Sequence, residues 1–401
     1  MYCVQSITSD LLLLGGSDRR LALFENVFPI PRGVSYNAYL LLDEKTVLLD
    51  TVDSAVSTRF FENLEHGLQG RPLDYVVVNH MEPDHCATLG EVLRRYPAAQ
   101  VVATAKAVSM IGQFFENDVS GRCLSVKEGD TLSTGRHCLH FAAAPMVHWP
   151  EVMVTYDAAD HILFSADAFG TFGALSGNIF ADEVNFETEW LADARRYYTN
   201  IVGKYGAQVQ ALLKKAAGLE IQMLCPLHGP IWRKNIEWFV EKYQRWSTYT
   251  PEDRTAAIFC GSIYGNTENA AEILAARLAE KGVTGIAFYD VSHTHVSELV
   301  AEAFRCSHLV FASATYNAEI YTPMDNFLRD LKSHGLRNRT VGLVENGSWA
   351  AQAGRQMSDL LASMKDMQVL EGTVTLKSSP KAEQRAGLEA LADALAADIL
   401  A

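Results

Sequence analysis

Seven histidine and acidic residues in the first part of the chain have the types and the spacing of a metal site. Four of them form one compact run directly after an apolar segment, and the other three follow at wide intervals. The set is His80, Glu82, Asp84, His85, His148, Asp167 and His228. Four imidazoles and three carboxylates are enough to hold two metal ions with one carboxylate shared between them. Each residue alone could be a turn or capping residue, but the whole set favours metal binding.

The segments around the compact run predict that it lies at the end of a buried strand. Residues 74–79 are rich in β-branched and aromatic side chains, which is typical of a strand. Pro83 then prevents a helix from simply continuing through the run. Alternate side chains of an extended stretch point the same way, so we expect His80, Glu82 and Asp84 to face one side. A loop held by a rigid scaffold is a usual place for such residues.

The three later residues of the set lie in similar contexts. Apolar runs over 146–150, 162–167 and 223–229 contain one of them each, which predicts that ligands converge from strand ends. Five other histidines lack a comparable set of acids, because a metal site needs three or four converging ligands. These histidines, which we do not assign to a metal, are His137, His140, His161, His293 and His295.

The ligand types narrow the choice of metal. A nitrogen-rich site suits zinc, whereas mixed imidazole and carboxylate ligation with open positions suits iron or manganese. Glu82 decides between them, because a histidine there would favour the chemistry of a zinc hydrolase. Carboxylates readily bridge two irons, and Asp167 is the natural candidate for the bridge.

The composition of the chain limits the classes of protein to which it can belong. A chain of 401 residues is expected to form two or three domains. Its net charge of −14 disfavours nucleic acid and anionic membrane surfaces as partners. We expect no signal peptide and no membrane helix, since the apolar runs are too short. The seven widely spaced cysteines are expected to be free thiols in a reducing cytoplasm.

A second domain begins after a linker-like stretch, which predicts domains at 1–252 and 253–401. Residues 256–260 read as a strand, 261–267 as a small polar loop, and 268–281 as an amphipathic helix. Backbone N–H groups and the helix dipole make such a loop a phosphate site, and Ser262 and Thr267 can add hydroxyls. The loop lacks the lysine of a P-loop, which disfavours a nucleoside triphosphate with magnesium. It also lacks the glycine pattern of a dinucleotide fold, which disfavours a dinucleotide.

Two further loops extend this site. They follow the apolar runs 308–312 and 341–344, and each contains an aromatic residue, Tyr316 and Trp349. Loops at the carboxyl ends of successive strands form the ligand crevice of a doubly wound parallel sheet. Together with the phosphate loop, two aromatic side chains that could flank a flat ring predict a flavin.

The compact run and its three distant partners resemble the diiron site of the flavodiiron proteins, also called A-type flavoproteins. The resemblance implies an N-terminal metallo-β-lactamase-like αββα sandwich followed by a flavodoxin-like domain. It implies reduction of dioxygen to water, of nitric oxide to nitrous oxide, or of both. Carried over, one iron would be held by His80, Glu82 and His148, the other by Asp84, His85 and His228, with Asp167 as bridge. In some members the histidine that matches His85 turns away from the metal.

The loops of the second domain resemble those of flavodoxin, which binds FMN. The phosphate would be held by the loop residues Ser262, Ile263, Tyr264, Gly265, Asn266 and Thr267. The isoalloxazine ring would be bordered by Ser313, Ala314, Thr315, Tyr316, Asn317, Asn346, Gly347, Ser348 and Trp349. The third loop departs from the commoner glycine-rich version.

The family also implies partners. Some members carry a C-terminal rubredoxin module, whose paired cysteines this chain lacks, so we expect an external donor. Rubredoxin is the expected donor, and a reduced deazaflavin is the alternative. A head-to-tail homodimer, or a dimer of such dimers, would bring the FMN of one subunit beside the diiron site of the other. Two other functions stay open: a metal-dependent hydrolase fused to a flavodoxin module, and a non-catalytic electron carrier or gas sensor.

Overall fold

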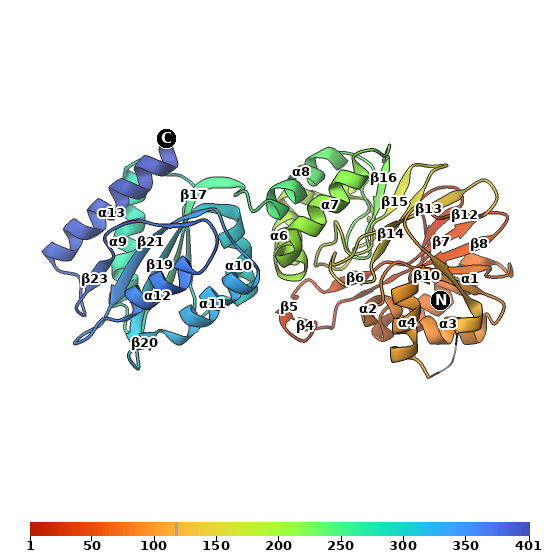
Figure 1. Ribbon diagram of the computed structural model, residues 1–401, viewed down its shortest axis with the longest axis horizontal. Coiled ribbons are helices and arrows are strands. Elements are labelled where there is room, and N and C mark those ends of the chain that lie inside the picture. Colours follow the sequence, from red (N-terminus) through yellow and green to blue (C-terminus); the bar gives the residue numbers. More distant parts are fainter. Residues whose placement is uncertain (117–118) are drawn as a thin grey trace. The chain divides into compact units, whose positions relative to one another are not determined.

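The computed structural model of the chain describes residues 1–116 and 119–401 and divides into two compact units (Figure 1). The first unit contains residues 1–198 and 207–243, and the second contains residues 199–206 and 244–401. No helix within the described ranges is both long enough and apolar enough to cross a lipid bilayer. All seven cysteines are free, as the sequence predicts.

The first unit is built on two sheets. In the first sheet the strand order is β1-β2-β7-β8-β9-β10-β11, and in the second it is β12-β13-β14-β15-β16. The bounds of the first sheet are β1 (Gln5–Ser6), β2 (Leu11–Leu13), β7 (Tyr39–Leu42), β8 (Thr46–Leu49), β9 (Tyr75–Val78), β10 (Gln100–Thr104) and β11 (Cys123–Val126). Those of the second are β12 (Thr131–Ser133), β13 (Cys138–Ala143), β14 (Met153–Asp157), β15 (Ile162–Phe164) and β16 (Met223–Cys225).

A shared apolar core joins the two sheets. Leu49 and Val77 of the first sheet belong to the same buried cluster as Phe141 and Phe164 of the second. Figure 1 shows helices on the outer side of each sheet, in the predicted αββα order. The bounds of these helices are α1 (Ser57–Leu68), α3 (Leu89–Arg95), α4 (Ala105–Phe114), α6 (Leu191–Tyr197), α7 (Gly206–Ala216) and α8 (Ile236–Ser247).

The second unit contains a parallel sheet in the order β18-β17-β19-β21-β22, with β23 also parallel to β21. Its strands are β17 (Asp253–Gly261), β18 (Ala287–Asp290), β19 (Cys306–Tyr316), β21 (Arg339–Asn346), β22 (Met367–Val369) and β23 (Val374–Leu376). Its helices are α9 (Asn266–Glu280), α10 (Val296–Arg305), α11 (Thr322–Ser333), α12 (Ala353–Ala362) and α13 (Ala382–Leu400). Separate apolar cores lie on the two faces of the sheet. This is the predicted doubly wound arrangement.

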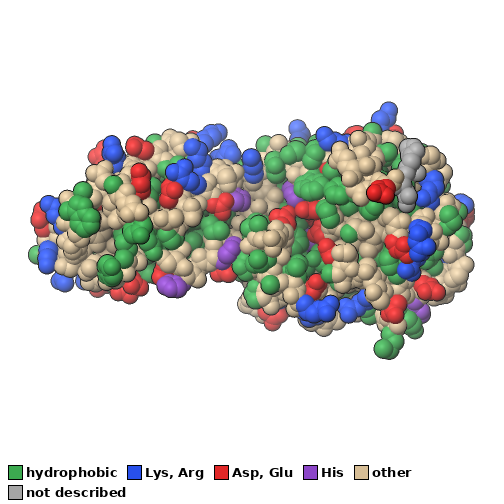
Figure 2. Space-filling model, turned by 90° about the horizontal axis from the view of Figure 1, so that it is seen from below, with side chains coloured by type: hydrophobic (Ala, Val, Ile, Leu, Met, Phe, Trp, Pro, Cys, Tyr) green, Lys and Arg blue, Asp and Glu red, His purple; other side chains and the backbone are tan. Residues whose placement is uncertain are grey.

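Charged side chains of both signs are distributed over the surface. On the face drawn in Figure 2, Lys and Arg are interspersed with Asp and Glu. This face therefore carries both signs of charge, although the net charge of the whole chain is −14.

Candidate functional site

The compact run forms a strand end followed by a short helix. Strand β9 ends at Val78, and the Asp50 carboxylate then accepts hydrogen bonds from the backbone N–H groups of Asn79 and His80, at 2.7 and 3.2 Å. The helix α2 (Pro83–Cys86) begins at Pro83, which is tolerated at the first helical position because its missing N–H would have no partner there. The prediction of one extended stretch is therefore wrong. The Asp84 side chain does not face the same side as those of His80 and Glu82.

Two groups of donor atoms result from this turn. In the first group, the Glu82 Oε2 atom lies 3.2 Å from His80 Nε2 and 3.0 Å from His148 Nε2. The Asp167 Oδ2 atom lies 3.2 Å from the same two nitrogens. The sequence predicts His148 at a strand end, but it lies in the loop between β13 and β14.

The second group shares Asp167 with the first. His85 Nε2 and His228 Nε2 are 3.1 Å apart, and each lies 3.3 Å from Asp84 Oδ2. The other oxygen of Asp167, Oδ1, lies 3.2 Å from His85 Nε2 and 3.6 Å from His228 Nε2. One carboxylate therefore faces both groups, one oxygen toward each.

The geometry fits a pair of metal ions. Ligand atoms bound at about 2.1 Å to one ion lie about 3.0–3.4 Å apart. The separations given above are of this size, except that between Asp167 Oδ1 and His228 Nε2, which is 3.6 Å. Both carboxylate oxygens of Asp84 and of Asp167 are buried, yet they accept no hydrogen bond from any residue that the structure describes. Buried carboxylates without a donor are costly unless a cation faces them. The structure thus brings all seven residues of the set together.

The electrostatics of the groups also call for cations. Burial lowers the pKa of His148, but the nearby carboxylates of Asp167 and Glu82 outweigh burial and raise this pKa to about 9. A similar balance of burial against carboxylate partners raises the pKa of His80 well above its usual value. Burial raises the pKa of Glu82, yet these two imidazoles outweigh it and lower that pKa. The donor set therefore demands positive charge, which divalent ions supply.

Residues behind the ligands fix their orientation. The Nδ1 atom of His80 lies 2.8 Å from Glu151 Oε1, which also accepts a hydrogen bond from the backbone N–H of Met81 at 2.9 Å. The Nδ1 atom of His228 lies 2.7 Å from the backbone oxygen of Ser35. A proton held on Nδ1 leaves the Nε2 lone pair free to face a metal. Neither Glu151 nor Ser35 carries a signal in the sequence, since both contacts join distant segments.

Tyr197 is a further residue that the sequence did not indicate. It is fully buried, its ring centroid lies 5.4 Å from that of His228, and the carboxylates of the site are near enough to help raise its pKa, after desolvation as the main cause. Its hydroxyl has no hydrogen-bond partner among the described residues. The phenol therefore lies beside the donor groups with a proton to offer.

His85 differs from the two oriented histidines. Its Nδ1 atom is buried and has no hydrogen-bond partner within the described part of the chain. The ring is held by packing against His80 and His228, with centroid distances of 5.8 and 4.6 Å. Of the three, His85 is thus the least restrained in rotation.

Replacing Glu151 by alanine is expected to weaken metal binding by about 10- to 100-fold, as is usual when a carboxylate behind a ligating histidine is lost. The His80 ring would lose its fixed tautomer, and the Met81 N–H would lose its acceptor. Titration of the metal-free protein with Fe²⁺ against a competing chelator measures the change. Glu91→Gln, an exposed carboxylate on α3 paired with Arg94 and Arg95, is the control. Equal affinities of the Glu151→Ala and wild-type chains would contradict the assigned role.

One other group in the first unit has donor atoms close together, at Asp10, His137 and Asp160. Here the Arg136 guanidinium donates hydrogen bonds to both carboxylates, and His137 Nδ1 lies 2.7 Å from Asp157. Arginine already supplies the positive charge that the acids require. We therefore keep His137 without a metal assignment.

In the second unit a cavity of about 600 Å³ lies at the carboxyl ends of β17, β19 and β21. Most of the predicted loop residues line it, from Ser262 to Trp349, whereas Gly265 and Ser313 do not. The lining also includes residues that the sequence did not indicate, namely Ala318, Ala350 and Ser378. Ser378 was missed because it follows β23, a short strand without a clear pattern.

The phosphate loop has the expected local structure. Gly265 has a φ of +84° at the N-cap of α9, a conformation that favours glycine. Its N–H donates to the Ser262 hydroxyl at 3.1 Å. The side-chain amide of Asn346 donates to the Thr267 hydroxyl at 3.2 Å, and its oxygen accepts from the backbone N–H of Ser378 at 3.0 Å. These bonds join three loops into one cradle at a helix N-terminus, which fits a phosphate.

The rim of this cavity is aromatic and exposed. Tyr264 and Trp349 are 91% and 95% exposed, and Tyr316 is 48% exposed. Aromatic side chains this exposed commonly serve a ligand or a protein partner. The cavity with its cradle and aromatic rim fits a flat ring bearing a phosphate.

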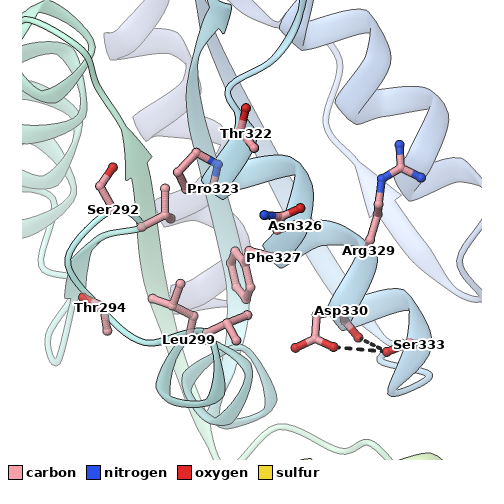
Figure 3. Close-up of a pocket in the computed structure, with 12 residues that line it drawn as sticks. Ser292, Thr294, Leu299, Thr322, Pro323, Asn326, Phe327, Arg329, Asp330 and Ser333 are labelled. Atoms are coloured by element: carbon pink, nitrogen blue, oxygen red, sulfur yellow. Dashed lines mark hydrogen bonds between the residues drawn. The ribbon is translucent and has the colours of Figure 1, made fainter. Parts of the chain in front are cut away.

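A second hollow of the same unit, about 660 Å³, lies between the segment around α10 and the helix α11 (Figure 3). Leu299 and Phe327 give it an apolar floor, and the Ser333 hydroxyl is hydrogen-bonded to Asp330 at its edge. None of the described residues that line it belongs to the cradle. We therefore assign ligand binding to the cavity at the carboxyl ends of the strands.

The chain is similar in sequence to a known family and to known proteins. A family model described as ODP family beta lactamase matches residues 34–229. The chain is 31% identical over 360 residues to the anaerobic nitric oxide reductase flavorubredoxin of Klebsiella pneumoniae, covering 88% of this chain and 74% of that protein. It is 32% identical over 334 residues to the flavorubredoxin of Escherichia coli, covering 82% and 69%.

The chain is also similar to solved structures over nearly its whole length. The rubredoxin oxygen:oxidoreductase of Desulfovibrio gigas is similar with a TM-score of 0.91 and 26% identity, over 99% of both chains. The flavodiiron protein of Giardia intestinalis is similar in fold, with a TM-score of 0.91 and 23% identity, over 100% of this chain and 98% of that one.

Proposed function

This chain belongs to the flavodiiron family of nitric oxide and oxygen reductases, and we propose that it works with FMN and a pair of iron ions. The observation that carries the proposal is the shared carboxylate of Asp167, which faces two complete groups of donor atoms in one chain. In this assignment residues 1–252 hold the iron and residues 253–401 hold the flavin.

Each ligand group would hold one iron. His80, Glu82 and His148 would bind the first and Asp84, His85 and His228 the second, with Asp167 between them. Bound iron would supply open positions for the gas and electrons for its reduction, which FMN would replenish. Mixed nitrogen and carboxylate ligation favours iron over zinc, and Glu82 gives the first group a carboxylate of its own besides the shared Asp167.

Other residues of the chain would orient the ligands, limit the access of water and hold the flavin. Glu151 and Ser35 hold the imidazoles in the tautomer that presents Nε2. The fully buried histidines and Asp167 would keep bulk water away from the buried side of the bound metal. In the second unit, the loops from Ser262 to Thr267 and from Asn346 to Trp349 would hold the FMN phosphate and border its ring.

We infer that the electrons come from an external donor, with the protein rubredoxin as the first candidate and a reduced deazaflavin as the alternative. The relative from Desulfovibrio gigas is named as a rubredoxin-linked enzyme. We also propose a head-to-tail homodimer, alone or as a dimer of dimers. The exposed Tyr264 and Trp349 around the flavin cavity support a partner surface there. The free thiols support a location in the cytoplasm.

Consumption of gas by the reduced holoprotein tests the proposal. The chain loaded with Fe²⁺ and FMN and reduced without oxygen is expected to consume dioxygen, nitric oxide or both, well above the same chain with FMN alone. The ratio of the two rates gives the gas preference. A chain that holds both iron and FMN and consumes neither gas would be a carrier or sensor. A chain that binds zinc instead and cleaves esters or amides would be a hydrolase.

A further inference from the structure

The first unit contains a cavity of about 400 Å³ that is separate from the donor groups. Residues of β3 (Gly16–Asp18), β6 (Val34–Tyr36) and α1 line it, together with the first residues of the chain and a loop that includes Gly177. None of the described lining residues belongs to either donor group. Pockets for small molecules have volumes of about 300–1000 Å³, so this cavity has room for one.

Two arginines line this cavity, and no aspartate or glutamate does so within the described part of the chain. Arg59 of α1 forms no hydrogen bond or ion pair with a described residue, and Arg19 donates one hydrogen bond, to the backbone oxygen of Leu175. The acid next to Arg19, Asp18, accepts two backbone hydrogen bonds and is not part of the lining. In a chain whose net charge is −14, the cavity is therefore a local excess of positive charge.

Two serine hydroxyls add hydrogen-bond donors to the wall. Ser17 and Ser35 face each other across β3 and β6, so their side chains lie on the same face of this strand pair. The Ser17 Oγ atom accepts a hydrogen bond from the N–H of Leu175 at 3.1 Å, and the Ser35 Oγ atom accepts one from the N–H of Gly229 at 2.7 Å. Neither hydroxyl donates to a described residue, which leaves both protons available. Because Ser35 is 1% exposed, its proton has little access to bulk water and is suited to a ligand in the cavity.

Guanidinium and hydroxyl groups are the side chains that bind the oxygens of phosphates and carboxylates, and the planar fork of arginine can donate two parallel hydrogen bonds to either. We propose that this cavity is a binding site for a small dianion, with Arg19 and Arg59 as its two charged contacts. The ligand carries either a phosphate group or two carboxylates, since both present the paired oxygens and the double negative charge that two guanidiniums require. A metal cation would be repelled by the same two charges.

The experiment is isothermal titration calorimetry of the full-length chain, loaded with FMN and Fe²⁺, without oxygen and at low ionic strength. Inorganic phosphate and succinate are titrated separately, and the anion that binds more tightly identifies the chemical class of the ligand. Bound FMN keeps the phosphate cradle of the second unit occupied. Arg59→Gln and Arg19→Gln are each expected to weaken binding by about 10-fold or more, because each removes a charge-assisted hydrogen bond. Arg59 has no described contact to lose, so its replacement should leave the unfolding temperature unchanged.

Arg20→Gln is the matched control, because it removes the same charge from an exposed arginine that is next to Arg19 but does not line the cavity. It should bind the anion with wild-type affinity. The absence of saturable binding of both anions to the wild-type chain would overturn the inference. Wild-type affinity in both Arg19→Gln and Arg59→Gln would also overturn it, since the anion would then bind elsewhere, for example at the metal. An equal loss in Arg20→Gln would show a general effect of net charge and would have the same consequence.

Discussion

Replacing Asp167 by alanine is expected to abolish metal binding at both positions and to lower gas reduction by at least about 1000-fold. Loss of a residue behind a ligand already costs about 10- to 100-fold, and Asp167 contributes one oxygen to each donor group. Its backbone is held firmly, because the N–H of Ser165 bonds to Cys225 and that of Phe169 to the Tyr243 hydroxyl.

The measurements are metal content per chain and steady-state consumption of oxygen and nitric oxide. Asp157→Ala is the matched control, because Asp157 is equally buried in the same unit but contacts His137 outside the ligand groups. It is expected to cost stability and to keep the metal. Retention of one tightly bound ion by Asp167→Ala would show that the two groups do not depend on a shared carboxylate.

The sequence predicted the strands that carry the site because their burial leaves a local pattern. Strands β9, β17, β19 and β21 each lie between two parallel neighbours and are buried on both faces, so their apolar runs are nearly continuous. Their carboxyl ends are then readable from the polar residues that follow. Both sites of this chain lie mainly at such ends, which is why most of their residues could be named.

What the sequence did not predict depends on contacts between distant segments. The turn of α2 separates Asp84 from His80 and Glu82, and a four-residue helix is too short to leave a periodic pattern. Glu151 orients His80 across 71 positions of the chain. Periodicity and spacing describe neighbours along one element, so they contain no information about such a bond.

In the second unit, Arg339 is another residue whose contacts with distant segments the sequence did not predict. It is 2% exposed at the start of β21, and among the described residues its guanidinium donates to backbone oxygens alone. The acceptors are Ala303 at 2.9 Å, Phe304 at 2.6 Å, Tyr249 at 2.8 Å, Arg337 at 2.8 Å and Asn338 at 3.0 Å. The planar fork of the side chain thus joins the end of α10, the segment at Tyr249 and the two residues before β21 into one network.

Replacing Arg339 by methionine is expected to lower the free energy of unfolding of the second unit by about 3–5 kcal/mol. The apolar substitute fills much of the volume but leaves the buried oxygens of Tyr249, Ala303 and Phe304 without donors, at about 1–3 kcal/mol each before relaxation. Denaturant unfolding of the full chain measures the loss, and amide exchange in β19 and β21 locates it. Arg329→Met, which replaces an exposed arginine of α11 paired with Asp325, should change stability by less than about 0.5 kcal/mol.

Strand β21 ends at Asn346, which joins the phosphate cradle. A loosened strand should therefore also release FMN more readily, and a variant of wild-type stability that binds FMN normally would refute the role of Arg339.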